Sequence, residues 1–428
     1  MHCNQCQQAL GGIACTTVGV CGKNGDIQGL QENLIYSMKG ISAYAYHSRE
    51  LGYVDEEIDA FLAEGLYATL TNVDFDPDAF LQINLRAGEI TIRAMDLLKK
   101  AHNESFGEMQ PAKVATGTSE GPGIIVTGHN LKALYELLKQ AEPRGVNVYT
   151  HSEMLPAHGY PKLKAFKNLK GNLGKAWFDQ RLLFAQFPGA ILGTSNCVLI
   201  PNEKYRDRMF THGIARLPGV EHIEGYDFGK LIARAEELPS LEDEPGKVEL
   251  TTGFGDNVVL PLADKILELV KAGKIRHFFL VGGCDAPGSV RNYYRELVQK
   301  APKDTVFLTL ACGKFRFNDL DLGHIDGIPR LLDMGQCNDA ISAIRVASAL
   351  AGALGCTVNE LPLTLVLSWM EQKAVAILMA LFSLGIKGIY LGPTLPAWLT
   401  PGLVGKLQEA FDLRLTTTAE ADLAKILG

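Results

Sequence analysis

The feature that most constrains the fold of this chain is a regular alternation of short apolar strands with helices, which begins near residue 123. The β-branched run GIIVT opens it at residue 123, and an amphipathic helix follows over Leu131–Gln140. Further strands are predicted at 146–151, 190–195, 277–283, 305–311, 330–336, 363–369, 388–392 and 413–416. Strands that alternate with helices indicate parallel sheets covered on both faces. We therefore predict a multidomain α + α/β protein with two doubly wound, Rossmann-like parallel-sheet domains.

The segment before this alternation is helical. Apolar residues recur at helical spacing over 28–49, 55–70 and 77–100, and Asp76 before Pro77 is a typical start of the third helix. Three amphipathic helices in a row predict an antiparallel bundle. Polar residues 103–123 are typical of a linker, and the charged, Pro-containing segment 236–246 indicates a second boundary. We expect domains at 1–115, 116–250 and 251–428.

Composition excludes several classes of protein. The chain has 428 residues and a formal net charge of −7, so it lacks the basic surplus that a nucleic-acid or anionic-membrane partner would require. The N-terminal sequence MHCNQCQQAL is too polar for a signal peptide. The longest uncharged apolar run, Ala374–Ile386, is shorter than the ~20 residues of a bilayer span. We expect a soluble, cytoplasmic protein.

Nine cysteines raise the question of metal binding. An odd number in a chain without an export signal fits poorly with a disulfide framework. Four of them, Cys3, Cys6, Cys15 and Cys21, lie within one short segment. Such a set can wrap one tetrahedral zinc ion or one iron–sulfur cluster, and the spacing favours neither strongly.

Further metal-ligand residues follow the predicted strands. They are His129, Glu153, Cys197, Cys284, Cys312, Cys337 and Glu371. Ligands of parallel sheets bind beyond the carboxyl ends of the strands, so this set of residues is hard to attribute to packing and indicates metal binding. Each residue alone has a simpler interpretation: a cysteine as a small buried hydrophobe, His129 as a helix cap, and Glu371 as part of a capping box with Ser368. Lys373 alone is typical of a solvated surface charge.

Several blocks of sequence together resemble the hybrid cluster protein (prismane) family, also called hydroxylamine reductases. These blocks are MHCNQCQQ, CTTVGVCGK, VTGHNLKAL, VYTHSEMLPAHGYP, TSNCVLIP, VGGCDAPGSVRNYY, LTLACGKFRFN, DMGQCNDA, SWMEQKAVAIL and LGPTLPAWL. They occur in the family's order over nearly the whole chain. The resemblance implies a fold similar to the catalytic subunit of carbon monoxide dehydrogenase.

The resemblance also implies two cofactors. A [4Fe-4S] cluster would be bound by Cys3, Cys6, Cys15 and Cys21. A hybrid [4Fe-2O-2S] cluster at the domain interface would be bound by His129, Glu153, Cys197, Cys284, Cys312, Cys337 and Glu371. Cys284 corresponds to a cysteine found as a persulfide, and Lys373 to a lysine beside the open face of the cluster. Cys356 has no counterpart in these blocks, and we expect a buried thiol there.

One departure from the longer family members concerns the helical region. Only residues 22–128 separate Cys21 from His129, which leaves room for one helical bundle where longer members carry two. The chain is therefore similar to the shortened forms of the family. The missing bundle would leave apolar surface uncovered, so we expect a homodimer.

The resemblance implies an oxidoreductase that reduces hydroxylamine to ammonia and water with two electrons and two protons. Glu371, Lys373 and His129 would move protons and Cys284 would take part at the cluster, while the N-terminal cluster relays electrons from an unidentified donor protein. Reduction of nitric oxide to nitrous oxide is an alternative within the same class. A redox or nitrosative-stress sensor that nitrosylates proteins, and a carbon monoxide dehydrogenase-like enzyme, are two further alternatives.

Overall fold

The structure is a computed structural model that describes residues 1–428. The chain forms two compact units, one of residues 1–101 with 355–428 and the other of residues 102–354. The boundaries of these units differ from those of the three predicted domains, and the three-domain division stays a prediction. The structure contains no helix that is both long and apolar enough to cross a membrane.

The first unit is built mainly from helices. The three predicted N-terminal helices are confirmed as α1 (Gly25–Glu50), α2 (Glu56–Ala68) and α3 (Pro77–Phe106). The C-terminal segment adds α12 (Gln372–Ser383), α13 (Pro401–Phe411) and α14 (Ala419–Leu427). It also adds three parallel strands in the order β14 (Leu363–Ser368), β15 (Tyr390–Gly392) and β16 (Arg414–Leu415).

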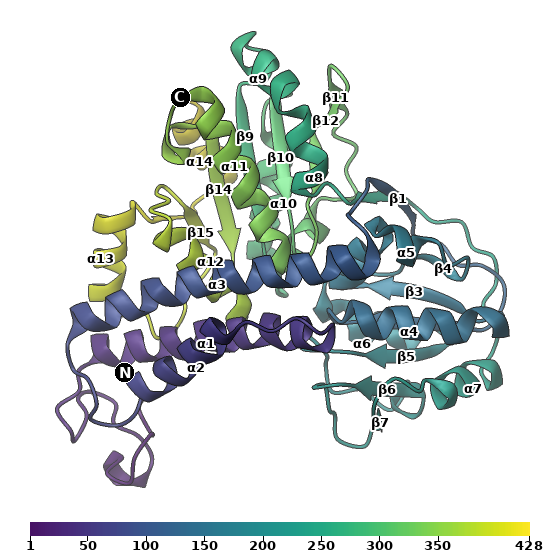
Figure 1. Cartoon of the computed structure of the whole chain (residues 1–428), viewed down its shortest axis with the longest axis horizontal. Helices are drawn as coiled ribbons and strands as arrows, with labels where there is room; N and C mark the ends of the chain where they lie inside the picture. The colour runs from purple at the N-terminus through teal and green to yellow at the C-terminus, as the bar shows by residue number, and fades with distance from the viewer. The chain divides into compact units, whose positions relative to one another are not determined.

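Helix α12 completes the helical bundle, and its position was not predicted. It packs against α1 and α3, and the three helices can be followed in Figure 1. Two glycines allow the close approach, because a Cβ added at Gly40 would lie 2.7 Å from Cβ of Ala376, and one added at Gly88 would meet the carbonyl of Met379. The C-terminal segment therefore supplies a fourth helix to a bundle that the sequence predicted from three consecutive ones.

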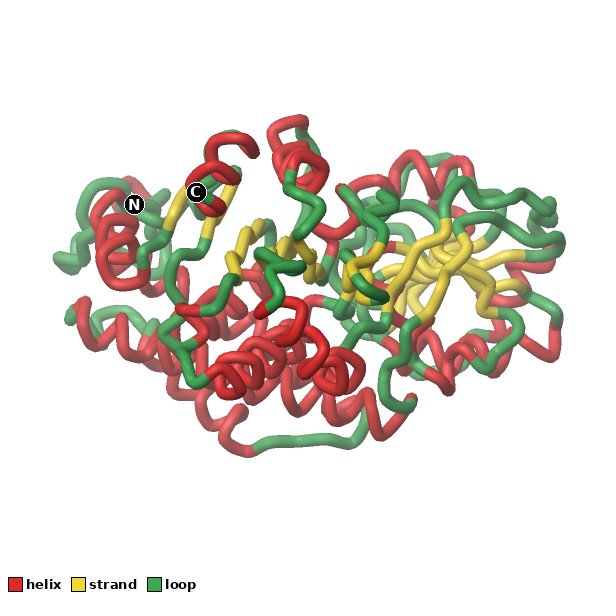
Figure 2. Tube along the Cα trace, turned by 90° about the horizontal axis from the view of Figure 1, so that it is seen from above, coloured by secondary structure: helices red, strands yellow, loops and turns green.

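The second unit contains an eight-stranded sheet in the order β7-β6-β5-β2-β3-β4-β1-β8. The central part, from β7 to β4, is parallel and has the order of a doubly wound fold, in which the chain runs outward from β2 in both directions. Every residue of β2 and β3 is buried, as expected for strands covered on both faces. Figure 2 shows this sheet as a layer of strands with helices on either side. The bounds are β1 (Ala112–Ala115), β2 (Gly123–Thr127), β3 (Asn147–His151), β4 (Leu169–Asn172), β5 (Ala190–Gly193), β6 (Met209–His212), β7 (Glu221–Ile223) and β8 (Glu249–Thr252), with helices α4 (Leu131–Ala141), α5 (Pro161–Lys164), α6 (Gln180–Gln186) and α7 (Gly229–Glu237).

The predicted linker at 103–123 is wrong. Helix α3 extends to Phe106, and β1 follows within the same segment and pairs antiparallel with β8. The predicted boundary segment 236–246 also belongs to this unit, since Leu241 and Glu244 form β-bridges with Gly121 and Thr118. The paired stretches in these segments are too short for sequence periodicity to reveal their pairing.

A second group of parallel strands in this unit has the order β13-β10-β9. The strands are β9 (His277–Gly283), β10 (Thr305–Thr309) and β13 (Leu331–Asp333), accompanied by a small hairpin of β11 (His324–Ile325) and β12 (Ile328–Pro329). The helices around them are α8 (Asp256–Val259), α9 (Ala263–Lys271), α10 (Tyr293–Lys300) and α11 (Ala340–Leu354). Each of the three strands leads directly into a loop that carries one cysteine.

Candidate metal centre

The predicted ligand residues of the second unit lie where parallel strands end. His129 and Glu153 follow β2 and β3, and Cys197 follows β5. The strand order changes direction at β2, which lies between β3 and β5 in the sheet. Ligands of doubly wound sheets bind at such a change of direction. Cys284, Cys312 and Cys337 follow β9, β10 and β13 in the same way.

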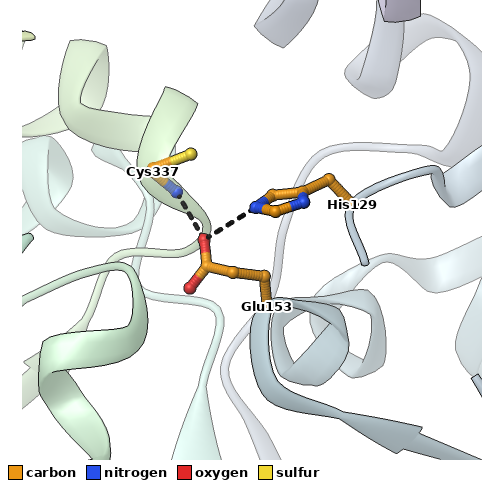
Figure 3. Close-up of side chains that lie close together, drawn as sticks. All are labelled: His129, Glu153 and Cys337. Carbon is orange, nitrogen blue, oxygen red and sulfur yellow. Dashed lines mark hydrogen bonds and ion pairs between the residues drawn. The ribbon is translucent and has the colours of Figure 1, made fainter. Parts of the chain in front are cut away.

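Three of these residues form a compact group in the interior. One ligand atom each of His129, Glu153 and Cys337 lies within 4.8 Å of the other two, and all three side chains are buried (Figure 3). Nε2 of His129 is 3.8 Å from Oε2 of Glu153. The backbone N–H of Cys337 donates a hydrogen bond of 2.9 Å to the same oxygen. The group thus presents one nitrogen, one carboxylate and one sulfur ligand at a single point.

The His129 ring is oriented by a hydroxyl group. Nδ1 of His129 is 2.8 Å from Oγ of Ser195, which leaves Nε2 facing Glu153. A hydrogen bond from the second ring nitrogen fixes the orientation of a metal-binding histidine. The interpretation of His129 as a helix cap is wrong, because the side chain of Asn130 caps α4 by accepting from the N–H of Ala133.

The thiol of Cys312 interacts electrostatically with three other predicted ligand residues. Burial raises the pKa of its thiol well above the ordinary value, and the charges of Glu153, Cys197 and Cys284 raise that pKa as well. Its Sγ is 3.1 Å from Oγ of Ser152. A cluster of buried acids that oppose each other's ionisation is stabilised when cations bind among them.

The backbone has a positive φ at each predicted ligand of this unit or within the two residues before it. Cys197 has φ +70°, and Ser152 and Ala311, which directly precede Glu153 and Cys312, have φ +55° and +62°. Glycines with positive φ lie directly before His129 and Cys284 and two residues before Cys337: Gly128, Gly283 and Gly335. Such conformations cost energy in non-glycine residues and are concentrated at functional sites. These turns aim the ligand side chains, and the sequence showed no sign of them at Ser152 or Ala311.

Gly128 shows why one of these turns requires glycine. Its φ is +113°, and an added Cβ would lie 2.4 Å from Oγ1 of Thr194 and 2.8 Å from the backbone nitrogen of Ser195. Both the conformation and the available space exclude a side chain there. The close approach also brings Ser195 to the ring of His129.

The donor set fits an iron–sulfur group that contains some oxygen- and nitrogen-ligated iron. Thiolates are soft ligands that favour iron–sulfur clusters, while imidazole and carboxylate groups suit harder iron. All of these donors except the half-buried Cys197 are buried. A cluster spreads its ligands over several metal ions, so Cys197, Cys284 and Cys312 need not share the narrow group of His129, Glu153 and Cys337.

Glu371 and Lys373 lie in the first unit, at the start of α12. Glu371 is the N-cap residue, and its carboxylate accepts from the N–H of Lys373 at 3.1 Å. The prediction that Glu371 caps a helix is therefore confirmed. The predicted capping box with Ser368 is wrong, because Glu371 itself is the N-cap residue. The interpretation of Lys373 as a solvated surface charge is wrong, because its side chain is buried with Nζ 4.0 Å from Oε1 of Glu371. The buried thiol expected at Cys356 is also wrong, since that residue is half-exposed.

The four N-terminal cysteines are all free thiols in the first unit. Cys3 and Cys15 exchange two backbone hydrogen bonds of 3.0 and 2.8 Å, which holds the two ends of the loop together. Backbone N–H groups of Val20 and Leu10 donate to the sulfur of Cys15 and lower the pKa of its thiol. Backbone donors of this kind stabilise a thiolate, the form that binds metal.

Two buried glutamines support the ligand loops and were missed by sequence reasoning. Gln180 donates to the carbonyl of Cys197 at 2.6 Å and accepts from the N–H of Leu199 at 3.1 Å. Gln336 precedes Cys337 and donates to carbonyls of two other ligand residues. The only sign of this role in the sequence is the position of Gln336 directly before the predicted ligand Cys337.

Comparison with known proteins agrees with this arrangement. The Prismane/CO dehydrogenase family matches residues 1–84 and 52–424 of the chain. A hydroxylamine reductase of Thermotoga maritima is 62% identical over 427 residues, which are 100% of this chain and 99% of that protein. A hydroxylamine reductase of Moorella thermoacetica is 61% identical over 428 residues, which are 100% of both chains.

Among solved structures, carbon monoxide dehydrogenase IV from Carboxydothermus hydrogenoformans has a similar fold. It superimposes with a TM-score of 0.80 at 15% sequence identity, and the match covers 99% of this chain and 92% of that one. This similarity concerns the fold alone. Because a family profile and full-length relatives both span the chain, the protein belongs to the Prismane/CO dehydrogenase family.

Proposed function

We propose that this protein is a hydroxylamine reductase, an oxidoreductase with iron–sulfur cofactors. The observation that carries the proposal is the buried group of His129, Glu153 and Cys337, in a chain that matches proteins named hydroxylamine reductase over its full length. The reaction converts hydroxylamine, two electrons and two protons into ammonia and water. Nitric oxide reduction and a sensor role find no comparable support among these relatives.

The cofactor at this site would be the hybrid iron–sulfur–oxygen cluster implied by the family resemblance. His129, Glu153, Cys197, Cys284, Cys312 and Cys337 would hold it, and the resemblance predicts Glu371 as a further ligand. When bound, such a cluster supplies reducible iron with a position that can accept the N–O group of the substrate.

The protein side chains have separate tasks in this proposal. Ser195 keeps Nδ1 of His129 hydrogen-bonded so that Nε2 is the ligand atom, and the N–H of Cys337 holds Oε2 of Glu153. Burial of these groups excludes bulk water, so protons for the leaving oxygen must come from positioned acids. We assign that task to Glu371 and Lys373, the charged pair at the start of α12, in which the lysine is buried and the glutamate is half-buried.

Electrons would enter through a [4Fe-4S] cluster bound by Cys3, Cys6, Cys15 and Cys21. The backbone hydrogen bonds to the sulfur of Cys15 support a thiolate role for this loop. A donor protein would deliver the electrons. Iron and zinc analysis of protein purified without oxygen tests this assignment: we expect iron for two clusters, and stoichiometric zinc with iron for one cluster would refute it.

We also propose that the protein forms a homodimer. Leu66 and Tyr67 at the end of α2, and Leu70 just beyond it, expose more than half of their surface. Contiguous exposed apolar surface usually marks an interface. Light scattering on the metal-loaded protein is the test. A monomer throughout the micromolar range would refute the dimer.

Steady-state turnover tests the activity itself. Purified protein with a reduced dye should consume hydroxylamine and release ammonia in equal amounts, faster than it consumes nitric oxide or carbon monoxide. A preference for nitric oxide with release of nitrous oxide would replace the proposal with the alternative reductase. Negligible turnover of all three substrates by protein that contains iron at both sites would favour the sensor.

A further inference from the structure

We propose that Gln336 is a positioning residue that fixes His129, Glu153 and Cys337 relative to one another. This inference rests on the proposed metal centre, because its purpose is to hold that centre's ligands in place. Gln336 lies on the loop between β13 and α11, directly before Cys337, and its side chain is 1% exposed.

The side-chain amide of Gln336 joins the loops of two other ligand residues. Its Nε2 donates a hydrogen bond of 2.7 Å to the carbonyl of Glu153 and a longer one of 3.4 Å to the carbonyl of His129. An amide nitrogen carries two hydrogens, so both are used on ligand residues. One side chain thereby connects the loops that follow β2, β3 and β13.

Two consecutive residues hold the main chain and the side chain of Glu153. Gln336 binds its main-chain carbonyl, and the N–H of Cys337 binds its carboxylate. The backbone N–H of Gln336 donates to Oδ2 of Asp339 at 2.8 Å, which fixes the loop to the first turn before α11. The carboxylate of Glu153 therefore cannot move away from Cys337 without breaking hydrogen bonds in a buried region.

The conformation of the two acceptor loops explains why such a support is needed. Gly128 and Ser152, which precede His129 and Glu153, have φ of +113° and +55°. A positive φ is strained in a non-glycine residue such as Ser152 and persists only where surrounding contacts determine it. A buried glutamine is unfavourable unless its polar atoms are paired, so its presence here indicates a positional role rather than packing.

The test compares two substitutions of Gln336 with a matched control. Gln336→Met keeps the size but removes both donors, and Gln336→Glu keeps the shape but directs an oxygen at two carbonyls. Gln140→Met is the control, because Gln140 Nε2 also donates to two carbonyls in the same unit, those of Tyr226 at 2.8 Å and Glu136 at 3.0 Å. Neither of those carbonyls belongs to a predicted ligand.

Hydrogen exchange of the full-length, metal-loaded protein is the primary measurement. In both Gln336 variants, peptides that contain His129, Glu153 and Cys337 should exchange faster by a factor of about ten, as expected for the loss of one buried hydrogen bond. Gln140→Met should accelerate only peptides near α4 and Tyr226. Iron analysis and electron paramagnetic resonance should show loss of iron from the second site and retention of the N-terminal signal.

Two results would overturn the proposal. Unchanged exchange at all three ligand peptides would show that the hydrogen bonds of Gln336 do not hold them. Uniform acceleration across residues 102–354 in both variants would show a role in general stability. Exchange does not depend on turnover, so a wild-type protein that fails to reduce hydroxylamine would refute the proposed function while leaving the role of Gln336 to be judged on this measurement.

Discussion

Lys314 and Asp333 form an ion pair that is almost completely shielded from solvent. Nζ of Lys314 is 2.5 Å from Oδ1 of Asp333, with 0% and 1% of the two side chains exposed. The same ammonium group donates to the carbonyl of Gly335 at 2.8 Å. Lys314 follows Cys312 by two residues and Asp333 ends β13, so the pair ties the Cys312 loop to the loop that carries Cys337.

Removal of the lysine should therefore destabilise the second unit. In Lys314→Met the carboxylate of Asp333 stays buried without its partner, which costs about 3–5 kcal/mol. The control is Lys113→Met, because the ion pair of Lys113 with Glu249 is exposed and such surface pairs add little stability. Urea unfolding measured by circular dichroism compares the two variants. Equal midpoints for both would show that the buried pair adds no stability.

Substitution of predicted ligands should separate the two metal sites. His129→Ala and Glu371→Gln are expected to abolish hydroxylamine turnover, because each removes a ligand or proton donor of the hybrid site. The N-terminal cysteines are distant from both residues in sequence, so the reduced variants should retain the electron paramagnetic resonance signal of that cluster. Full turnover by Glu371→Gln would show that its carboxylate serves only as the cap of α12.

Gly128→Ala should disturb the proposed metal centre by changing the backbone conformation directly before His129. The positive φ alone costs about 1–3 kcal/mol in a strained site, and the added Cβ would also collide with Thr194 and Ser195. Gly145→Ala provides the control, since Gly145 has φ +68° but nothing within 4 Å of an added Cβ. We expect thermal unfolding to shift further for Gly128→Ala, with loss of iron from the second site only in that variant. Similar shifts with full iron content would show that the close contact with Ser195 is unimportant.

Stability should fall at acid pH partly because of His158. Burial lowers the pKa of this histidine from 6.5 to about 4, so the unfolded chain binds its proton more readily than the folded one. The stabilising contribution is complete above pH 6.5 and is lost as pH falls towards 4, which amounts to about 2 kcal/mol by pH 5. Urea unfolding at pH 7.5 and pH 5 should show a smaller difference for His158→Gln than for the wild type. An identical pH dependence would exclude His158 as a contributor.

The sequence by itself determined the elements that depend on local pattern. Period-2 and continuous apolar runs located the buried strands β2, β3, β9 and β10, and helical periodicity located α1 to α3. The ligand residues could be proposed because each follows such a strand, and parallel strands direct their carboxyl ends to a common edge. The short strands β1 and β4 escaped detection, because a strand of four residues is too short to show a clear period.

Only the tertiary structure decided which distant segments meet. Apolar periodicity records that a face is buried but does not specify the partner, so the packing of α12 on α1 through Gly40 could not be predicted. The convergence of His129, Glu153 and Cys337 depends on strand order and on backbone conformations such as that of Ser152. The hydrogen bonds from Gln336 to two ligand loops depend on the same order, because they join residues more than 180 positions apart in the chain.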